Sequence, residues 1–394
     1  MKKEKLIIIS TVLVDVLGFG IVIPILPFYV KEFGASPLTI TLMFSAFSFF
    51  SFLSAPFLGA LSDRMGRRPV MIASICSTSL GWFVFAGATS IPFLFLGRII
   101  DGAAAGNFTT AQSYLVDLSK DEKERTANLG VIGAVFGIGF MLGPILGGVL
   151  SKVSHAFPFW IAGGMAALNA TLAFFFLPES HHHRSGQAPM NFNPMQPLVR
   201  AAADVTLRPL YISWFIFAMA FVTSQSVFAL FAHDVFGFDS FTTGSLFTLS
   251  GVIVALNQGF LLKHVWLKNF REATLEWMMM LVLAIGLFLF GLQSLPLFYA
   301  GIVLLGTGQA VSRVVVTSGI AGGADPRRKG EALGILASIM SACMVLAPIA
   351  AGLLYEWHHT SPYFFASANL LVGCVLAFRR RGVRVADSSA SPAA

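Results

Sequence analysis

Twelve apolar segments, each about 20 residues long, decide what this chain can fold into. That length allows an α-helix to cross the hydrocarbon core of a bilayer. Only 11% of the residues are charged, against about 25% in soluble domains. The segments cover approximately residues 6–28, 38–61, 70–88, 92–116, 128–150, 157–177, 209–231, 242–262, 274–292, 296–319, 331–353 and 361–378. The pattern predicts an all-α membrane protein with twelve transmembrane helices.

The basic residues fall in alternate links between these segments. All but four of the 26 Lys and Arg residues lie in links on one side of the membrane. Lys31 and Lys152 lie on the other side, and Arg98 and Arg313 lie within apolar segments. Because cytoplasmic links are enriched in Lys and Arg, we expect both termini in the cytoplasm and a bacterial plasma-membrane location. The net charge of +7 is therefore a topology signal, and no nucleic-acid partner is expected.

An internal repeat divides the segments into two halves. Pro92, Gly97, Gly102 and Pro144 each have an identical residue 204 positions later. This offset predicts two pseudo-symmetric six-helix bundles in parallel orientation.

The repeat also suggests the domain boundaries. We expect an N-terminal bundle at 1–177, a cytoplasmic linker at 178–208, a C-terminal bundle at 209–379 and a disordered tail at 380–394. His181–His183 in the linker could bind a metal, but a flexible polar stretch explains them too, and no metal site is predicted.

The link after the second segment reads GALSDRMGRRPV, residues 59–70. An acid among three arginines in a tight turn with two glycines can latch one bundle against another. A topology signal with Asp63 as a helix cap would explain the same residues, and we favour the latch. The latch residues are Gly59, Asp63, Arg64, Gly66, Arg67 and Arg68.

The fifth segment carries a glycine every four residues. Gly139, Gly143 and Gly147 share one helix face, beside Pro144 and Gly148. A face of small residues allows close contact with a neighbouring helix. Packing alone could explain this face; we favour an additional role in preventing leakage through the bundle.

These motifs resemble those of one transporter family. Residues 59–70 resemble the loop signature of the major facilitator superfamily, LGRIIDGAAAG (96–106) its fourth-span motif, and GIGFMLGPILGG (137–148) its antiporter motif. The first span and FLPESH after the sixth resemble the tetracycline–proton antiporter branch in particular. The resemblance covers essentially the whole chain and implies alternating access in a proton-driven exporter. It also implies that Asp63 engages the start of the eleventh span, and that Arg67 pairs with an acid such as Asp117.

The chain departs from that branch in three places. Tetracycline exporters carry mid-membrane acids in spans three and nine, and the matching residues 78–83 and 279–286 contain none. The second copy of the loop motif, at 261–272, lacks the Gly and the Asp. Tetracycline itself is therefore not the expected substrate, although the transport class is retained.

Three charged residues lie deep within the apolar segments. Arg98 and Asp101 are one helical turn apart, and Asp15 is near the middle of the first segment. A charge at the bilayer centre costs about 2.5–3.5 kcal/mol on insertion scales. Arg98 and Asp101 map onto Ile302 and Leu305 of the second half, so the repeated frame does not require them. Since spans one and four line the cavity in the family that the chain resembles, we predict that both acids share Arg98 and hold one exchangeable proton. A buried pair that only fixes two helices is the alternative.

Aromatic and polar side chains at helical spacing are predicted to line the same cavity. They are Gln112, Trp214, Phe217, Phe221, Gln225, Gln309 and Arg313. Aromatic walls with sparse polar groups suit an amphipathic organic molecule better than a sugar. Core packing explains the aromatic residues equally well.

The sequence thus predicts a proton-coupled efflux antiporter for hydrophobic or amphipathic small molecules. A dedicated exporter of one metabolite, such as a siderophore or lipid, is one alternative, and a non-transporting membrane receptor is another. Because no His, Cys or Ser cluster offers a catalytic set, no enzymatic activity is expected. The expected partners are the substrate, protons and the lipid bilayer; we expect a monomer without a cofactor.

Overall fold

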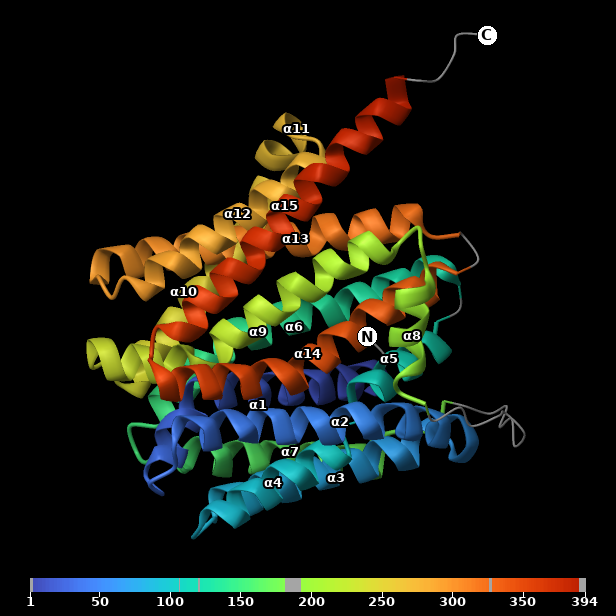
Figure 1. Ribbon diagram of the computed structural model, residues 1–394. Helices are drawn as coiled ribbons and strands as arrows, with labels where there is room; N and C mark the ends of the chain where they lie inside the picture. Colours follow the sequence, from blue (N-terminus) through green and yellow to red (C-terminus); the bar gives the residue numbers. More distant parts are fainter. Residues whose placement is uncertain (1–2, 106, 120, 181–192, 326–327, 390–394) are drawn as a thin grey trace. The chain divides into compact units, whose positions relative to one another are not determined.

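The computed structural model describes residues 3–105, 107–119, 121–180, 193–325 and 328–389, and among these it contains helices and no strand (Figure 1). Contacts between helices group the chain into two compact units. Unit 1 comprises Met1–Pro194 and Phe228–Leu249, and unit 2 comprises Met195–Val227 and Ser250–Ala394.

Unit 1 is built mainly from seven consecutive helices. They are α1 (Lys3–Lys31), α2 (Pro37–Met65), α3 (Arg67–Ala86), α4 (Ile91–Ala103), α5 (Asn107–Asp117), α6 (Glu122–Leu150) and α7 (Phe157–Phe176). Within this unit α3 packs against both α4 and α7, and α1 packs against α6 and α7 (Figure 1).

Unit 2 contains the remaining helices, and two of them contribute residues to both units. In chain order they are α8 (Gln196–Ala203), α9 (Arg208–Phe236), α10 (Ser240–Leu256), the π-helix η1 (Asn257–Trp266), α11 (Leu267–Asn269), α12 (Glu272–Gly291), α13 (Leu295–Gly323), α14 (Lys329–Trp357) and α15 (Ser361–Ser389). Helix α12 packs against α13 and α15.

Eleven helical stretches within the described residues are long and apolar enough to cross a membrane. The expected single helix over 92–116 is wrong, because α4 ends at Ala103 and α5 begins at Asn107, with a turn at Ala104 and Ala105. Membrane proteins tolerate such a break where the backbone is buried in protein or lines a cavity. Together α4 and α5 cover the fourth apolar segment, which is absent from the eleven stretches and brings the number of spans to twelve.

Capping residues fix where several helices begin. Ser36, Asp121 and Asp239 precede α2, α6 and α10, and each accepts a hydrogen bond from the backbone N–H three residues later, at 3.3, 2.7 and 2.8 Å. Such bonds satisfy N–H groups that have no partner inside the helix. Hydrogen bonds from Thr242 also lower the pKa of Asp239.

Two segments that the sequence predicts to be irregular contain helix. Within the linker, α8 begins with a proline in its first turn, where the missing N–H costs nothing. Its Arg200 forms a 2.6 Å ion pair with Glu331 of α14. At the tail, α15 continues to Ser389, because extending an existing helix avoids the cost of nucleation. His181–His183 lie outside the described residues.

The repeated glycines make the same close approach in each unit. A Cβ added at Gly97 would stand 2.8 Å from the carbonyl oxygen of Gly81, and one added at Gly301 would stand 2.8 Å from that of Gly286. Both distances are shorter than real Cβ atoms show. The α3–α4 contact of unit 1 thus has a counterpart in the α12–α13 contact of unit 2.

Candidate functional site

An enclosed ion pair lies in the last two turns of α4. Arg98 Nη1 is 3.2 Å from Asp101 Oδ2. Arg98 is 1% exposed and Asp101 is 6% exposed. The Thr78 side chain of α3 also hydrogen-bonds to Asp101. The pair therefore holds two opposite charges inside unit 1, where little solvent can screen them.

Aromatic rings enclose the guanidinium of Arg98. Its Cζ lies 4.3 Å from the ring centroid of Phe47 on α2 and 5.3 Å from that of Trp82 on α3. Both distances allow a cation–π interaction. The Arg98 Nε atom is buried and has no hydrogen-bond partner among the described residues. Asp101 and two ring faces thus stabilise the cation.

Glycines bring the neighbouring helices close to this pair. A Cβ at Gly81 would stand 2.9 Å from Asp101 Cβ, and a Cβ at Gly102 would stand 2.5 Å from the carbonyl oxygen of Phe47. Helices α2 and α3 therefore meet α4 almost backbone to backbone on either side of the pair. The break in α4 follows directly, at Ala104 and Ala105.

Asp15 lies half-buried on α1, three residues before Gly18. A Cβ at Gly18 would stand 3.7 Å from Trp82 Nε1, so the Trp82 indole lies between α1 and Arg98. The sharing of Arg98 between Asp15 and Asp101 stays a prediction. Sequence reasoning did not identify Phe47, Trp82 or Thr78, because helical spacing relates residues of one helix only.

The predicted cavity residues differ in their surroundings. Trp214 is 5% exposed, and its indole Nε1 donates a 2.9 Å hydrogen bond to the Leu336 carbonyl of α14. Phe217 is also buried and stacks on Phe221 with 6.0 Å between ring centroids. Within unit 2, Trp214 and Phe217 therefore pack against neighbouring side chains. Phe221, Gln112, Gln225 and Gln309 are half-buried, and Arg313 is exposed.

A polar cluster that the sequence did not single out lies where α10 becomes the π-helix η1. Asn257, 3% exposed, donates to Thr307 Oγ1 of α13 at 3.3 Å and accepts from Trp266 Nε1 at 3.0 Å. Gln258 donates to the Ala310 carbonyl at 3.3 Å. The adjacent amides in NQGF were a usable signal, because polar groups in a membrane helix need partners.

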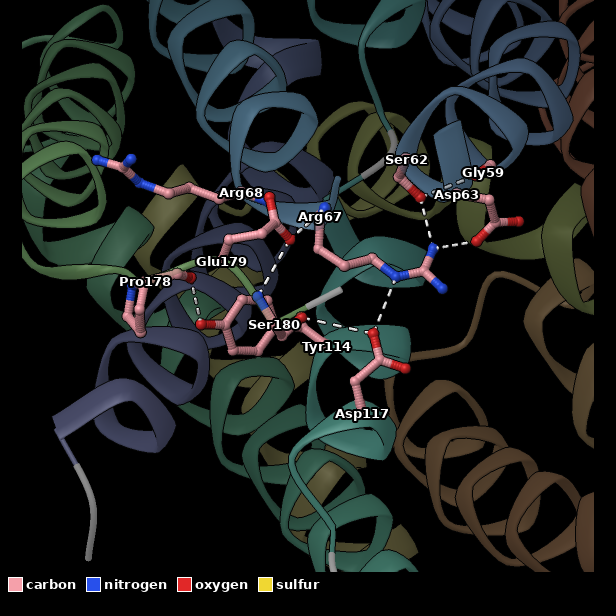
Figure 2. Close-up of polar contacts among 10 residues, drawn as sticks. All are labelled: Gly59, Ser62, Asp63, Arg67, Arg68, Tyr114, Asp117, Pro178, Glu179 and Ser180. Carbon is pink, nitrogen blue, oxygen red and sulfur yellow. Dashed lines mark hydrogen bonds and ion pairs between the residues drawn. The ribbon is translucent and has the colours of Figure 1, made fainter. Parts of the chain in front are cut away.

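A second charged group, the α2–α3 turn cluster, joins α2, α3, α5 and the segment that follows α7 in unit 1. We define it as Ser62, Asp63, Arg67, Asp117 and Glu179 (Figure 2). Arg67 Nη1 lies 2.5 Å from Asp63 Oδ1, and its Nε lies 3.2 Å from Asp117 Oδ2. The pair between Arg67 and Asp117 is the one that the family resemblance implied. The Ser62 hydroxyl accepts a further 2.7 Å bond from Arg67.

Glu179 was missed by sequence reasoning, although it belongs to the quoted FLPESH segment. Its carboxylate accepts hydrogen bonds from the backbone N–H groups of Arg67 at 2.9 Å and Arg68 at 3.3 Å. These groups form the N-terminus of α3, where a negative charge is stabilised. Just before Glu179, the Pro178 carbonyl accepts a 2.6 Å bond from the Tyr114 hydroxyl. The chain leaving α7 is thus tied to the start of α3.

The two glycines of this turn are not equivalent. Gly66 has a φ of +107°, and a Cβ there would stand 2.1 Å from Glu179 Oε2. At Gly59, by contrast, a Cβ would meet nothing within 4 Å. The fold therefore needs glycine at 66 for both backbone conformation and space, and has no such need at 59.

The glycines of α6 lie against two neighbours inside unit 1. A Cβ at Gly143 would stand 2.8 Å from Gly20 Cα of α1, and one at Gly139 would stand 2.6 Å from Val16. On another side of α6, a Cβ at Gly148 would stand 2.9 Å from Phe241 Cα of α10. These positions act as close-contact surfaces on α6, together with Gly147 and Pro144.

We expect Gly143→Ala to destabilise the protein by about 1–3 kcal/mol, since the added methyl would force α1 away from α6. Thermal unfolding in detergent measures the effect. Gly137→Ala is the matched control, because a Cβ at Gly137 meets nothing within 4 Å and alanine favours a helix. Equal unfolding temperatures for the two variants would contradict the close contact.

Within the part of the chain that the structure describes, no group of three or more His, Cys, Asp or Glu side chains could hold a metal ion.

Comparison with known proteins agrees with the motifs and the fold. The family model described as Major Facilitator Superfamily matches residues 8–275 and 265–393. The class C tetracycline resistance protein of Escherichia coli is 27% identical over 384 residues, covering 95% of this chain and 96% of that protein. The quinolone resistance protein NorA of Staphylococcus aureus (strain MSSA476) is 26% identical over 385 residues, with the same coverage.

Solved structures share the fold. The human organic anion transporter MFSD10 (TETRAN) matches with a TM-score of 0.70 and 25% identity, covering 96% of this chain and all of that chain. The nucleoside transporter NupG matches with a TM-score of 0.76 at 14% identity, covering 96% and 98%. The predicted all-α fold of twelve transmembrane helices in two six-helix bundles is confirmed, and the relatives are transporters and not enzymes. The chain is a multi-pass membrane transporter that belongs to the major facilitator superfamily.

Proposed function

We propose that the protein is a proton-coupled antiporter that exports hydrophobic or amphipathic small molecules by alternating access. The observation that carries this proposal is the enclosed Arg98–Asp101 pair, which the second half of the repeat lacks. The names of two relatives, which confer tetracycline and quinolone resistance, support the direction and the substrate class. Both termini would lie in the cytoplasm of a bacterial cell.

The pair supplies a means of exchanging a proton. While Arg98 contacts Asp101, the guanidinium balances the negative charge of the carboxylate, and the rings of Phe47 and Trp82 help to hold the guanidinium in place. If a conformational change draws the guanidinium away, the carboxylate is left uncompensated at low dielectric and takes up a proton. The turn at Ala104 and Ala105 gives this end of α4 room to move, as broken helices do in other transporters. Asp15 on α1 is the proposed second acid of the site.

The α2–α3 turn cluster and the glycine face of α6 have supporting roles in this proposal. The cluster would act as the cytoplasmic gate, in which the Asp63 side chain is 47% exposed and the Asp117 side chain 22%. The close contact of α6 with α1 would limit leakage when the gate is open.

We expect cells that produce the protein to resist several amphipathic drugs, including a quinolone, and an uncoupler to abolish that resistance. Each proton moved down a 100 mV potential supplies about 2.3 kcal/mol, so export should fail when the gradient collapses. Minimum inhibitory concentrations with and without the uncoupler measure this. Resistance to no drug in the panel would favour a dedicated exporter of one metabolite, and resistance that survives the uncoupler would refute proton coupling.

A further inference from the structure

An apolar groove of about 470 Å³ lies between α3 and α7 of unit 1. It is lined on α3 and α7 by Ile72, Cys76, Ser79, Leu80, Phe83, Ala167, Ala170, Thr171, Phe174 and Phe175. The two hydroxyl groups of this lining are occupied: Ser79 donates to the Gly163 carbonyl at 2.9 Å, and Thr171 donates to the Ala167 carbonyl at 2.9 Å. The groove therefore offers an apolar surface to whatever enters it.

The walls of the groove are open to the surroundings of the protein. Leu80 is 54% exposed, Phe174 57% and Phe175 70%. In a membrane transporter, apolar side chains with such exposure face lipid acyl chains. The part of α3 that lines the groove, from Ile72 to Phe83, is roughly 17 Å long at 1.5 Å per residue. That length is close to half of a hydrocarbon core of about 30 Å, which is the depth of one leaflet.

A cation lies one helical turn beyond the end of this groove. Arg68 precedes Ile72 by four residues, and its Nη2 donates a 2.6 Å hydrogen bond to the Phe174 carbonyl. Among the described residues, that carbonyl is the one hydrogen-bond partner of the Arg68 side chain, and no acid forms an ion pair with it. Figure 2 shows the Arg68 guanidinium pointing away from Arg67, Asp63 and Asp117.

The neighbouring Arg67, by contrast, forms ion pairs with acidic side chains. Arg67 is neutralised by Asp63 and Asp117, while Glu179 bonds to the backbone of Arg68 and not to its guanidinium. A guanidinium has five N–H donors, so Arg68 keeps donors for an anionic oxygen. A cation without an ion-pair partner among the described residues therefore lies at the end of an apolar groove whose length matches about one leaflet.

We propose that this groove binds an anionic glycerophospholipid, with one acyl chain between α3 and α7 and the headgroup phosphate against Arg68. A phosphate accepts charge-assisted hydrogen bonds from a guanidinium, and anionic lipids are enriched in the cytoplasmic leaflet, on the side where the basic links predict this end of α3. The lipid would extend the hydrogen-bonded tie between α3 and α7. This proposal concerns a lipid-facing surface of unit 1 and does not depend on the transport activity.

Native mass spectrometry of the detergent-solubilised protein tests it, with phosphatidylglycerol and phosphatidylcholine of identical acyl chains added at equal concentration. We expect the wild type to retain more phosphatidylglycerol than phosphatidylcholine. Arg68→Gln should reduce that preference about fivefold, the usual effect of one basic residue on an anionic lipid surface. Arg68→Lys should keep most of the preference. Arg271→Gln removes an exposed arginine elsewhere and should change nothing.

A second variant tests the acyl-chain site independently of charge. Cys76 is exposed in the groove, so Cys76→Phe fills it from the lipid side and should lower retention of both lipids. Equal phosphatidylglycerol retention by the Arg68→Gln and Arg271→Gln proteins would overturn the headgroup contact. Unchanged lipid retention by Cys76→Phe would overturn the groove as the acyl-chain site, even if Arg68→Gln failed to fold.

Discussion

Asp101→Asn is expected to give a folded protein that neither transports substrate nor releases protons when substrate binds. Asparagine keeps the shape of the side chain and its hydrogen bond to Thr78, but it cannot lose a proton at any relevant pH. Proton release by the detergent-solubilised protein and drug uptake by proteoliposomes both measure the loss. Wild-type values in both assays would remove the Arg98–Asp101 pair from the proton pathway.

Substitution of the arginine partner should mainly reduce the stability of the fold. Arg98→Gln leaves the Asp101 carboxylate buried without its counter-charge, which costs about 3–5 kcal/mol. The double variant Arg98→Gln with Asp101→Asn should regain most of that stability and still fail to transport. A pair that only fixed helices would give a double variant that both folds and transports.

A buried ion pair in unit 2 provides the control. Glu276 on α12 is 4% exposed and pairs with Arg380 of α15. Glu276→Gln should lower stability in the same assay, while the molecules that remain folded keep the proton release of the wild type. Loss of proton release in Glu276→Gln would show that the assay reports folding rather than the site.

Gly66→Ala is expected to have the largest effect on the α2–α3 turn cluster. Its φ of +107° is strained for any other residue, which costs about 1–3 kcal/mol, and the new methyl would stand 2.1 Å from Glu179 Oε2. The Glu179 carboxylate would have to leave the N-terminus of α3. Thermal unfolding in detergent and transport in proteoliposomes should both decline.

Gly59→Ala, in the same motif, should do the reverse. A Cβ at this position meets nothing within 4 Å, and alanine is favoured over glycine inside a helix by roughly 0.5–1 kcal/mol. We expect an unfolding temperature equal to or above that of the wild type. A loss as large as that of Gly66→Ala would show that Gly59 serves a contact made in another conformation.

Sequence reasoning predicted the parts of the fold that follow from segment length and from the internal repeat. Segment length predicted the spans, and the offset of 204 predicted that Gly97 and Gly301 would have equivalent roles, which their close contacts with Gly81 and Gly286 support. It did not predict the break after α4, since three alanines favour helix and the packing of Gly102 on Phe47 is a tertiary contact.

The spacing of residues predicted the Arg98–Asp101 site only where its members lie on one helix. The spacing of Arg98 and Asp101 suggested their ion pair directly, whereas Phe47, Trp82 and Thr78 come from α2 and α3. Glu179 is more than 100 residues from Arg67 in the chain, and no pattern within a single segment relates the two. The loop motif identified Arg67. It did not identify Glu179, whose carboxylate accepts hydrogen bonds from the backbone at the start of α3.

The glycines that flank the Arg98–Asp101 pair carry no charge, yet they influence how strongly its charges attract. At Gly81 and Gly97 a hydrogen atom stands where other residues have a carbon, and this lets α3 and α4 approach closely enough to leave little room for water. The Coulomb energy of two charges varies inversely with the local dielectric constant. A methyl group at either position would separate the helices, admit solvent and weaken the ion pair without touching either charged residue.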